Sequence, residues 1–207
     1  MDKQKAVLMN SGGPDSLMCA IVTHKEYDLY SVYIDGGVPN KIRALPIAKR
    51  IADKYCVSHE VIDIGNRAIP ELSYFNKSWQ KSIFRKRHVG KERINVPFQG
   101  QVFKSLSAMY AMTIGIQTIV IGEDQHIKGK EQCDLFNHWS FNIVGLGNKI
   151  NWILPLYNYN NIQIAELVKS DEELKDYTVS CDYKVACYDC IKCARKKSMG
   201  LKEELYV

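Results

Sequence analysis

The sequence predicts an α/β protein with a doubly wound parallel sheet and a small metal-binding segment near its C-terminus. Three observations support this prediction. Short apolar runs alternate with segments of helical period between Ala6 and Gly122, a glycine-rich turn follows the first run, and four cysteines crowd between Cys181 and Cys193. Nearly continuous apolar strands that alternate with helices are typical of a parallel sheet covered on both faces.

The elements of this sheet can be placed in order along the chain. Residues 6–9 form a short apolar run that predicts a strand, and residues 15–23 have apolar positions at helical spacing. Further strands are expected at residues 29–34, 61–64 and 118–121, and further helices at residues 42–55 and 102–114. In such sheets, ligands bind at the carboxyl ends of the strands.

The composition of the 207-residue chain is that of a globular protein, with 46% hydrophobic and 25% charged residues. Extended disorder is therefore excluded as its main feature. No run approaches the roughly 20 apolar residues of a membrane span, and the first ten residues do not have the form of a signal peptide. We expect a cytoplasmic protein with no membrane partner.

The turn at residues 11–16 reads Ser-Gly-Gly-Pro-Asp-Ser and lies where the first strand ends and the first helix begins. Unpaired amides and the helix dipole can hold phosphate at such a place. Gly12 and Gly13 allow the backbone to approach a ligand closely. The hydroxyls of Ser11 and Ser16 can add to the amides, and Asp15 could reach a magnesium ion. No lysine follows the glycines, so this is not a Walker A loop.

The C-terminal cysteines have the spacing C-x5-C-x2-C-x2-C, formed by Cys181, Cys187, Cys190 and Cys193. Consecutive x2 gaps let sulfurs converge on one tetrahedral ion, which favours a structural zinc site; an iron–sulfur cluster and a redox dithiol are the alternatives. We expect the surplus negative charge of the thiolates to be offset by basic residues close in sequence, namely Lys192, Arg195, Lys196 and Lys197.

The glycine turn resembles the SGGxDS signature of PP-loop ATP pyrophosphatases, which split ATP between its α and β phosphates and activate a substrate as its adenylate. The order of this turn, a strand ending Ile121-Gly122 and the cysteine cluster resembles the QueC family of 7-cyano-7-deazaguanine synthases. The resemblance covers nearly the whole chain, and its matching segments are residues 11–16, 96–97, 119–122 and 181–193.

This resemblance implies an ATP-dependent ligase that forms carbon–nitrogen bonds. Such an enzyme converts 7-carboxy-7-deazaguanine to the nitrile through an adenylate and an amide, using ATP, magnesium and a structural zinc ion, as a homodimer. It implies a PP-loop ATP-binding domain over residues 1–175, with a basic insertion at about 70–95, and a zinc-binding segment over residues 176–207.

The resemblance also assigns candidate site residues. The ATP-binding candidates are Ser11, Gly12, Gly13, Asp15, Ser16, Asp35 and Gly122. The catalytic candidates are Asp15, Ser16, Lys104 and Asp124, and the substrate-binding candidates are Gln101, Glu123 and Cys133.

The segments next to the substrate depart from the family pattern. Residues 97–101 replace a Pro-Gly-Arg-Asn loop, and Gln132-Cys133-Asp134 replaces Asp-Cys-Arg. Three other functions therefore stay open: a ligase that joins the deazaguanine carboxylate to a protein amine, as in QueC-like relatives of bacterial defence operons, a PP-loop enzyme that modifies tRNA, and a non-catalytic nucleotide-binding zinc protein. The basic stretch at residues 77–93 is compatible with an RNA partner, an acidic protein partner or a solvated insertion.

Overall fold

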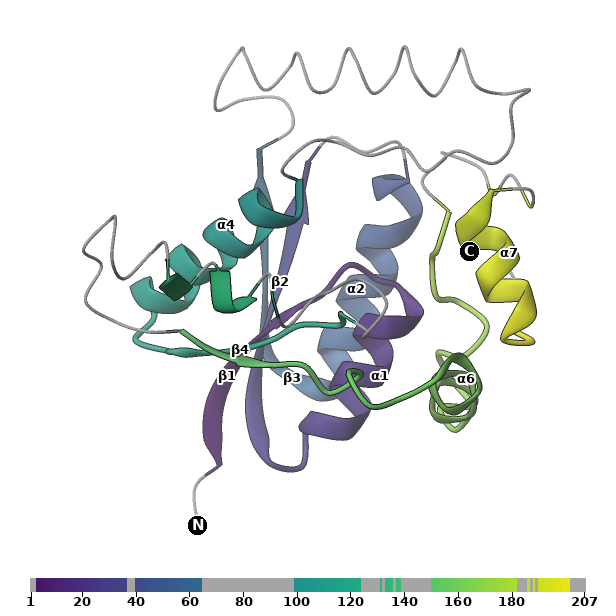
Figure 1. The fold of residues 1–207 in the computed structure, drawn as a ribbon, viewed down its shortest axis with the longest axis horizontal. Coiled ribbons are helices and arrows are strands. Elements are labelled where there is room, and N and C mark those ends of the chain that lie inside the picture. The colour runs from purple at the N-terminus through teal and green to yellow at the C-terminus, as the bar shows by residue number, and fades with distance from the viewer. Residues whose placement is uncertain are drawn as a thin grey trace.

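The computed structural model describes residues 3–36, 40–64, 99–123, 131, 133–135, 137–138, 150–181, 186, 188 and 190–201. Within these residues, five parallel strands form one sheet in the order β3-β2-β1-β4-β5 (Figure 1). The bounds of the strands are β1 (Gln4–Met9), β2 (Tyr27–Asp35), β3 (Cys56–Asp63), β4 (Thr118–Val120) and β5 (Asn151–Ile153). The predicted parallel sheet is therefore confirmed.

Helices cover both faces of this sheet (Figure 1). The helices α1 (Pro14–Thr23) and α2 (Lys41–Tyr55) pack on one face, and α4 (Gln99–Thr113) packs on the other. Val7 and Leu8 are neighbours on β1, yet each is fully buried in a different core cluster. Because alternate side chains of a strand point to opposite faces, a central strand between two helical layers must be apolar throughout. This is why the first strand reads as an unbroken apolar run.

Some elements differ from the sequence prediction. The strand β3 begins at Cys56, whereas the sequence predicts a strand only from residue 61. The first half of β3 carries Ser58 and Glu60, which are exposed at the edge of the sheet. A polar edge strand leaves no apolar run in the sequence. The short strand β5 and the helices α6 (Asn161–Lys169) and α7 (Ile191–Ser198) were not predicted at all.

The order of the strands reverses beside β1. The chain passes from β1 to β2 on one side, and it later returns to pair β4 with the other side of β1, with Val7 opposite Ile119. In open α/β sheets, ligands bind at the carboxyl edge where such a reversal occurs. The segments that follow β1 and β4 therefore meet at the expected binding edge.

The chain after α6 returns to this same edge. The backbone N–H of Val179 donates a hydrogen bond to the carbonyl oxygen of Gly12 at 2.9 Å. The side chains of Asn40 and Arg43, at the start of α2, each donate to the carbonyl oxygen of Cys181 at 3.0 Å. Backbone contacts thus fix the C-terminal segment against the glycine turn and α2, and α7 lies on that side of the molecule (Figure 1).

A buried carboxylate anchors the turn that leads into this segment. Asp171 accepts hydrogen bonds from Lys54 at 2.8 Å and from the hydroxyl of Tyr55 at 2.6 Å, and its other contacts are the backbone N–H groups of Glu173 and Leu174. Its side chain is fully buried. The end of α2 and the turn after α6 are therefore held together through one side chain. None of the helices in these described ranges is both long and apolar enough to cross a membrane.

Candidate functional site

The glycine turn between β1 and α1 has, at its second position, a backbone that strongly favours glycine. Gly12 has a φ of 71°, in the left-handed region, and a Cβ atom built there would lie 2.4 Å from the carbonyl oxygen of Ala44. Both the conformation and the close approach to α2 exclude a side chain. The glycine of the predicted nucleotide turn thus sets how closely the turn packs on α2.

Asn10 orders the start of this turn, and sequence reasoning did not single it out. Its side-chain oxygen accepts a hydrogen bond from the N–H of Gly12 at 3.1 Å, while its amide nitrogen donates to Ser31 at 3.0 Å and to the carbonyl oxygen of Ala48 at 2.8 Å. The side chain is almost completely buried. Asn10 therefore connects the turn to β2 and α2, which a local motif cannot reveal.

The two serines of the turn lie side by side. The backbone N–H of Ser11 donates to the hydroxyl of Ser16 at 2.9 Å, and the two hydroxyl oxygens are 3.0 Å apart. Gly13 occupies the N-cap position of α1 and has no side chain to cap the first amides of the helix. A helix start with this composition leaves its amides and its positive dipole end for an anionic ligand.

Asp15, in the first turn of α1, is bound by an arginine from α7. Arg195 donates to the two carboxylate oxygens at 3.3 Å and 3.5 Å, and to the side-chain oxygen of Asn161 at 3.2 Å. Both partners of the ion pair are about one third exposed, at 32% and 29%. That Arg195 offsets the thiolates stays a prediction, and its guanidinium also contacts Asp15 of the glycine turn. Lys196 is buried and donates to the carbonyl oxygen of Thr178.

Three further candidates meet beyond the end of β4. Lys104, on α4, is fully buried and donates to Glu123 at 2.5 Å. Burial raises the pKa of the Cys133 thiol to about 12, with a further increase from the negative charge of Glu123. The thiol is therefore protonated near neutral pH. Gln101 lies on α4 one turn before Lys104 and is half-buried.

Gly122 brings this group beside the glycine turn. A Cβ atom built on Gly122 would lie 3.0 Å from the Cβ of Asp15. The residue that precedes Glu123 thus touches the first turn of α1. The candidate nucleotide turn and the candidate substrate residues share one edge of the sheet, as the position of the strand reversal requires.

Asp35, at the end of β2, is buried and forms an ion pair with Lys41 at 2.8 Å. The hydrogen bond to Asp35 raises the pKa of the Lys41 ammonium above its ordinary value, although partial burial lowers it. Asp35 lies at the carboxyl edge of the sheet, but its carboxylate is engaged with the start of α2. Its role as an ATP-binding residue stays a prediction.

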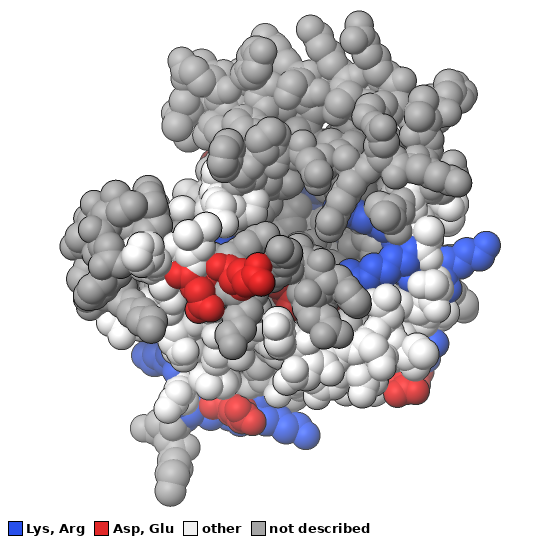
Figure 2. All heavy atoms as spheres, viewed as in Figure 1, with Lys and Arg blue, Asp and Glu red and all other residues white. Residues whose placement is uncertain are grey.

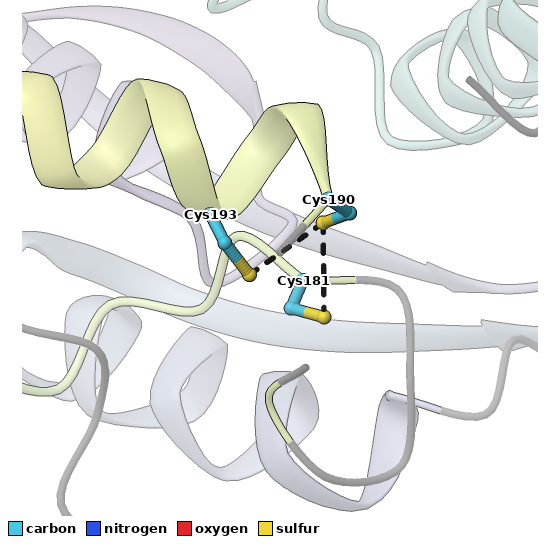
Figure 3. A group of neighbouring side chains, drawn as sticks. All are labelled: Cys181, Cys190 and Cys193. Carbon is cyan, nitrogen blue, oxygen red and sulfur yellow. Dashed lines mark hydrogen bonds between the residues drawn. The ribbon is translucent and has the colours of Figure 1, made fainter. Parts of the chain in front are cut away.

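Three of the C-terminal cysteines, Cys181, Cys190 and Cys193, form a compact group (Figure 3). The sulfur of Cys190 lies 3.5 Å from that of Cys193 and 4.0 Å from that of Cys181. Sulfurs at the corners of a zinc tetrahedron with Zn–S bonds of about 2.3 Å are roughly 3.8 Å apart. The two measured distances bracket this value, so these residues could hold a zinc ion. Cys187, the fourth predicted ligand, lies outside the described residues.

Two other predictions also fall outside the described residues, namely the catalytic candidate Asp124 and the basic stretch at residues 77–93. Among the described side chains, Lys and Arg gather on the side of the molecule where α7 lies (Figure 2). Arg195, Lys196 and Lys197 belong to the last turn of that helix. Helix α7, which begins at the candidate metal group, thus places Arg195 next to the glycine turn.

The parallel α/β sheet, its strand reversal beside β1 and the Ser-Gly-Gly-Pro-Asp-Ser turn at that place fit the PP-loop class of α/β proteins. The family model for the queuosine biosynthesis protein QueC matches residues 5–204. The chain therefore belongs to the QueC family.

Curated relatives agree with this membership. A 7-cyano-7-deazaguanine synthase of Clostridium botulinum strain Langeland is 27% identical over 224 residues, which cover 100% of this chain and 99% of the relative. Enzymes of the same name from Methanococcus maripaludis and Chlorobium luteolum are each 27% identical; both alignments cover 93% of this chain, and 92% and 89% of the relative, respectively.

A solved structure shares the fold. It is that of a predicted subunit of tRNA methyltransferase from Methanocaldococcus jannaschii, with a TM-score of 0.50 and 18% sequence identity. The superposition covers 79% of this chain and 75% of the other. At this identity the likeness shows the fold alone.

Proposed function

We propose that this protein uses ATP to adenylate the carboxylate of 7-carboxy-7-deazaguanine, or of a close analogue, and then replaces AMP with ammonia. In the first step a carboxylate oxygen attacks the α-phosphorus and pyrophosphate leaves. Ammonia then attacks the acyl carbon, AMP leaves with the carboxylate oxygen, and a proton is lost, which gives the amide. A second adenylation, now on the amide oxygen, releases another pyrophosphate, and loss of AMP with the amide oxygen and of both amide protons then gives the nitrile, 7-cyano-7-deazaguanine.

The observation that supports this function best is the contact between the glycine turn and the end of β4. Asp15 and Gly122 touch, so that groups beyond Gly122 lie next to the phosphate-binding helix start. In-line attack on a phosphate requires the attacking carboxylate to be held beside the α-phosphorus. The membership in the QueC family and the names of the curated relatives support the same reaction.

The residues of the turn have separate roles in this proposal. The amides at the start of α1 and the hydroxyls of Ser11 and Ser16 bind the β and γ phosphates, which become the leaving pyrophosphate. Arg195 provides the cation that a Walker A loop would supply with its lysine, and Asp15 orients that guanidinium. Asp15 would also help to hold a magnesium ion bound by the phosphates, and this ion would offset part of their charge.

The cysteines have a structural role. A zinc ion supplies folding free energy through its thiolate bonds, and a closed four-thiolate site offers no position for a reacting water. Cys190 is the N-cap residue of α7 and Cys193 lies in its first turn. A metal held there fixes the helix that carries Arg195, so the metal group supports the nucleotide turn from a distance.

A second candidate function is a ligase that joins the activated carboxylate to an amine of a protein instead of ammonia. It is favoured by the substrate-side segments, since residues 97–101 and 132–134 depart from the family pattern while the glycine turn is kept. Under this reading the first adenylation is unchanged, and the reaction ends at an amide.

Product analysis distinguishes these outcomes. The protein is incubated with ATP, magnesium and 7-carboxy-7-deazaguanine, with and without ammonia, and the products are identified by mass spectrometry. A nitrile supports the first proposal, and an amide-linked conjugate in a mixture with protein supports the second. Asp15→Ala and Ser16→Ala should abolish AMP and pyrophosphate formation without loss of zinc, whereas the surface variants Asp53→Ala and Ser170→Ala should not. Undiminished AMP formation by the first pair contradicts the assignment of the turn.

A further inference from the structure

A buried ion pair beyond β4 has one oxygen that the described residues leave without a hydrogen bond. Lys104 is fully buried, and its partner Glu123 is 15% exposed. The Oε1 atom of Glu123 accepts the hydrogen bond from Lys104. The Oε2 atom is buried and has no hydrogen-bond partner among the described residues. A carboxylate oxygen buried without a donor is unfavourable, and in native proteins such an atom calls for an explanation.

We propose that Oε2 of Glu123 accepts hydrogen bonds from the N–H edge of a bound 2-amino-6-oxopurine-like base, and that this contact determines which base the protein accepts. The inference rests on the proposed function of the neighbouring turn, and adds to it the part of the substrate that is recognised.

The position of Glu123 fits a substrate contact. It follows Gly122, which touches Asp15 in the first turn of α1. A base held by Glu123 therefore lies next to the place proposed for the phosphates. The same carboxylate faces α4 through Lys104 and is close enough to Cys133 to raise its pKa. Oε2 itself is buried, which limits competition from water.

The chemistry of the carboxylate selects one kind of base. An ionised carboxylate only accepts hydrogen bonds. A 2-amino-6-oxopurine edge presents two adjacent donors, the ring N–H and the exocyclic amine, and both can reach one side of a carboxylate. An adenine-like edge presents an acceptor nitrogen in the place of the ring N–H. That ring nitrogen would set its lone pair against a lone pair of the carboxylate, so the carboxylate disfavours an adenine-like base.

Lys104 acts here as a positioning residue. Because it is fully buried and its ammonium is bound to Oε1, its effect on the substrate passes through Glu123. The hydrogen bond from the ammonium to Oε1 fixes the rotamer of the carboxylate. Oε2 is therefore presented in one orientation, which a lone exposed glutamate would not provide.

The experiment compares binding of two ligands to variants of the full-length protein. The ligands are 7-carboxy-7-deazaguanine and its analogue without the 2-amino group, and dissociation constants are measured by isothermal titration calorimetry, together with that of ATP. In Glu123→Gln the amide oxygen still accepts from Lys104, but the amide NH2 group faces the donors of the base. We expect roughly 10- to 100-fold weaker binding of 7-carboxy-7-deazaguanine.

The double variant K104M/E123L separates recognition from folding, since exchange of a whole buried ion pair for apolar side chains is often neutral for stability. We expect wild-type protein to prefer the 2-amino ligand by roughly tenfold or more, and the folded double variant to bind both ligands equally with unchanged ATP affinity. The matched control K49M/D53L removes a surface pair on α2 whose side chains are 64% and 59% exposed, and it should behave as wild type. Preference that persists in the double variant overturns the inference.

Failure of the inference and failure of the proposed function give different results. If 7-carboxy-7-deazaguanine binds in a manner that depends on Glu123 but yields no AMP, the recognition stands and the proposed reaction is wrong. If AMP forms while both ligands bind equally to wild-type protein, the reaction stands and the recognition by Glu123 is wrong.

Discussion

Replacement of Gly12 by alanine tests the geometry of the nucleotide turn, and the same replacement at Gly115 is the matched control. Gly12 and Gly115 have nearly the same left-handed backbone, with φ of 71° and 72°. A non-glycine residue in this region costs about 1–2 kcal/mol. At Gly115 a new Cβ would meet nothing within 4 Å, whereas at Gly12 it would lie 2.4 Å from the backbone oxygen of Ala44. Overpacking of that kind adds about 1–3 kcal/mol.

We therefore expect Gly12→Ala to lower the free energy of unfolding by about 2–5 kcal/mol and Gly115→Ala by about 1–2 kcal/mol. Urea unfolding measures both values. Because the added methyl group must push the turn away from α2, Gly12→Ala should also weaken ATP binding at least tenfold, while Gly115→Ala should not. Equal destabilisation by the two variants, or normal ATP binding by Gly12→Ala, would refute this account of the turn.

Three further predictions concern the support of the site. Burial raises the pKa of Asp171, but hydrogen bonds from Lys54 and a tyrosine lower it more, so its net pKa lies below its ordinary value; Asp171→Asn should therefore cost about 2–3 kcal/mol in unfolding experiments at pH 7, and the difference from wild type should begin to shrink below about pH 4 and disappear only below the lowered pKa of the folded state. Cys190→Ser should lose zinc by metal analysis and weaken ATP binding, whereas Cys56→Ser should retain both. Arg195→Ala should weaken ATP binding several-fold in calorimetry with zinc unchanged, and unchanged affinity would contradict its role as the phosphate cation.

The sequence predicts the parts of the site that depend on neighbours along the chain. The apolar run of β1 and the periodic helix after it locate the turn at residues 11–16, and the x2 gaps between cysteines bring Cys190 and Cys193 together on one turn of α7. Both patterns follow from the fixed periods of strands and helices.

Contacts between distant segments leave no such signal. Arg195 and Asp15 are 180 residues apart, and Asn10 reaches Ala48 across 38 residues. Lys104 and Glu123 belong to different elements, so their ion pair is visible only once α4 packs beside β4. The short strand β5 reads Asn-Trp-Ile, without the run of β-branched residues that marks β4, which reads Thr-Ile-Val. Such features depend on tertiary packing, which overrides local propensity.

The central claim is that the carboxylate of the substrate becomes an AMP ester at the glycine turn. The most direct test uses 7-carboxy-7-deazaguanine with both carboxylate oxygens labelled with oxygen-18, incubated with the protein, ATP, magnesium and ammonia. Mass spectrometry should find one labelled oxygen in the AMP released with the amide, and the second in the AMP released with the nitrile. Label in inorganic phosphate together with ADP, or AMP without label, would contradict the claim.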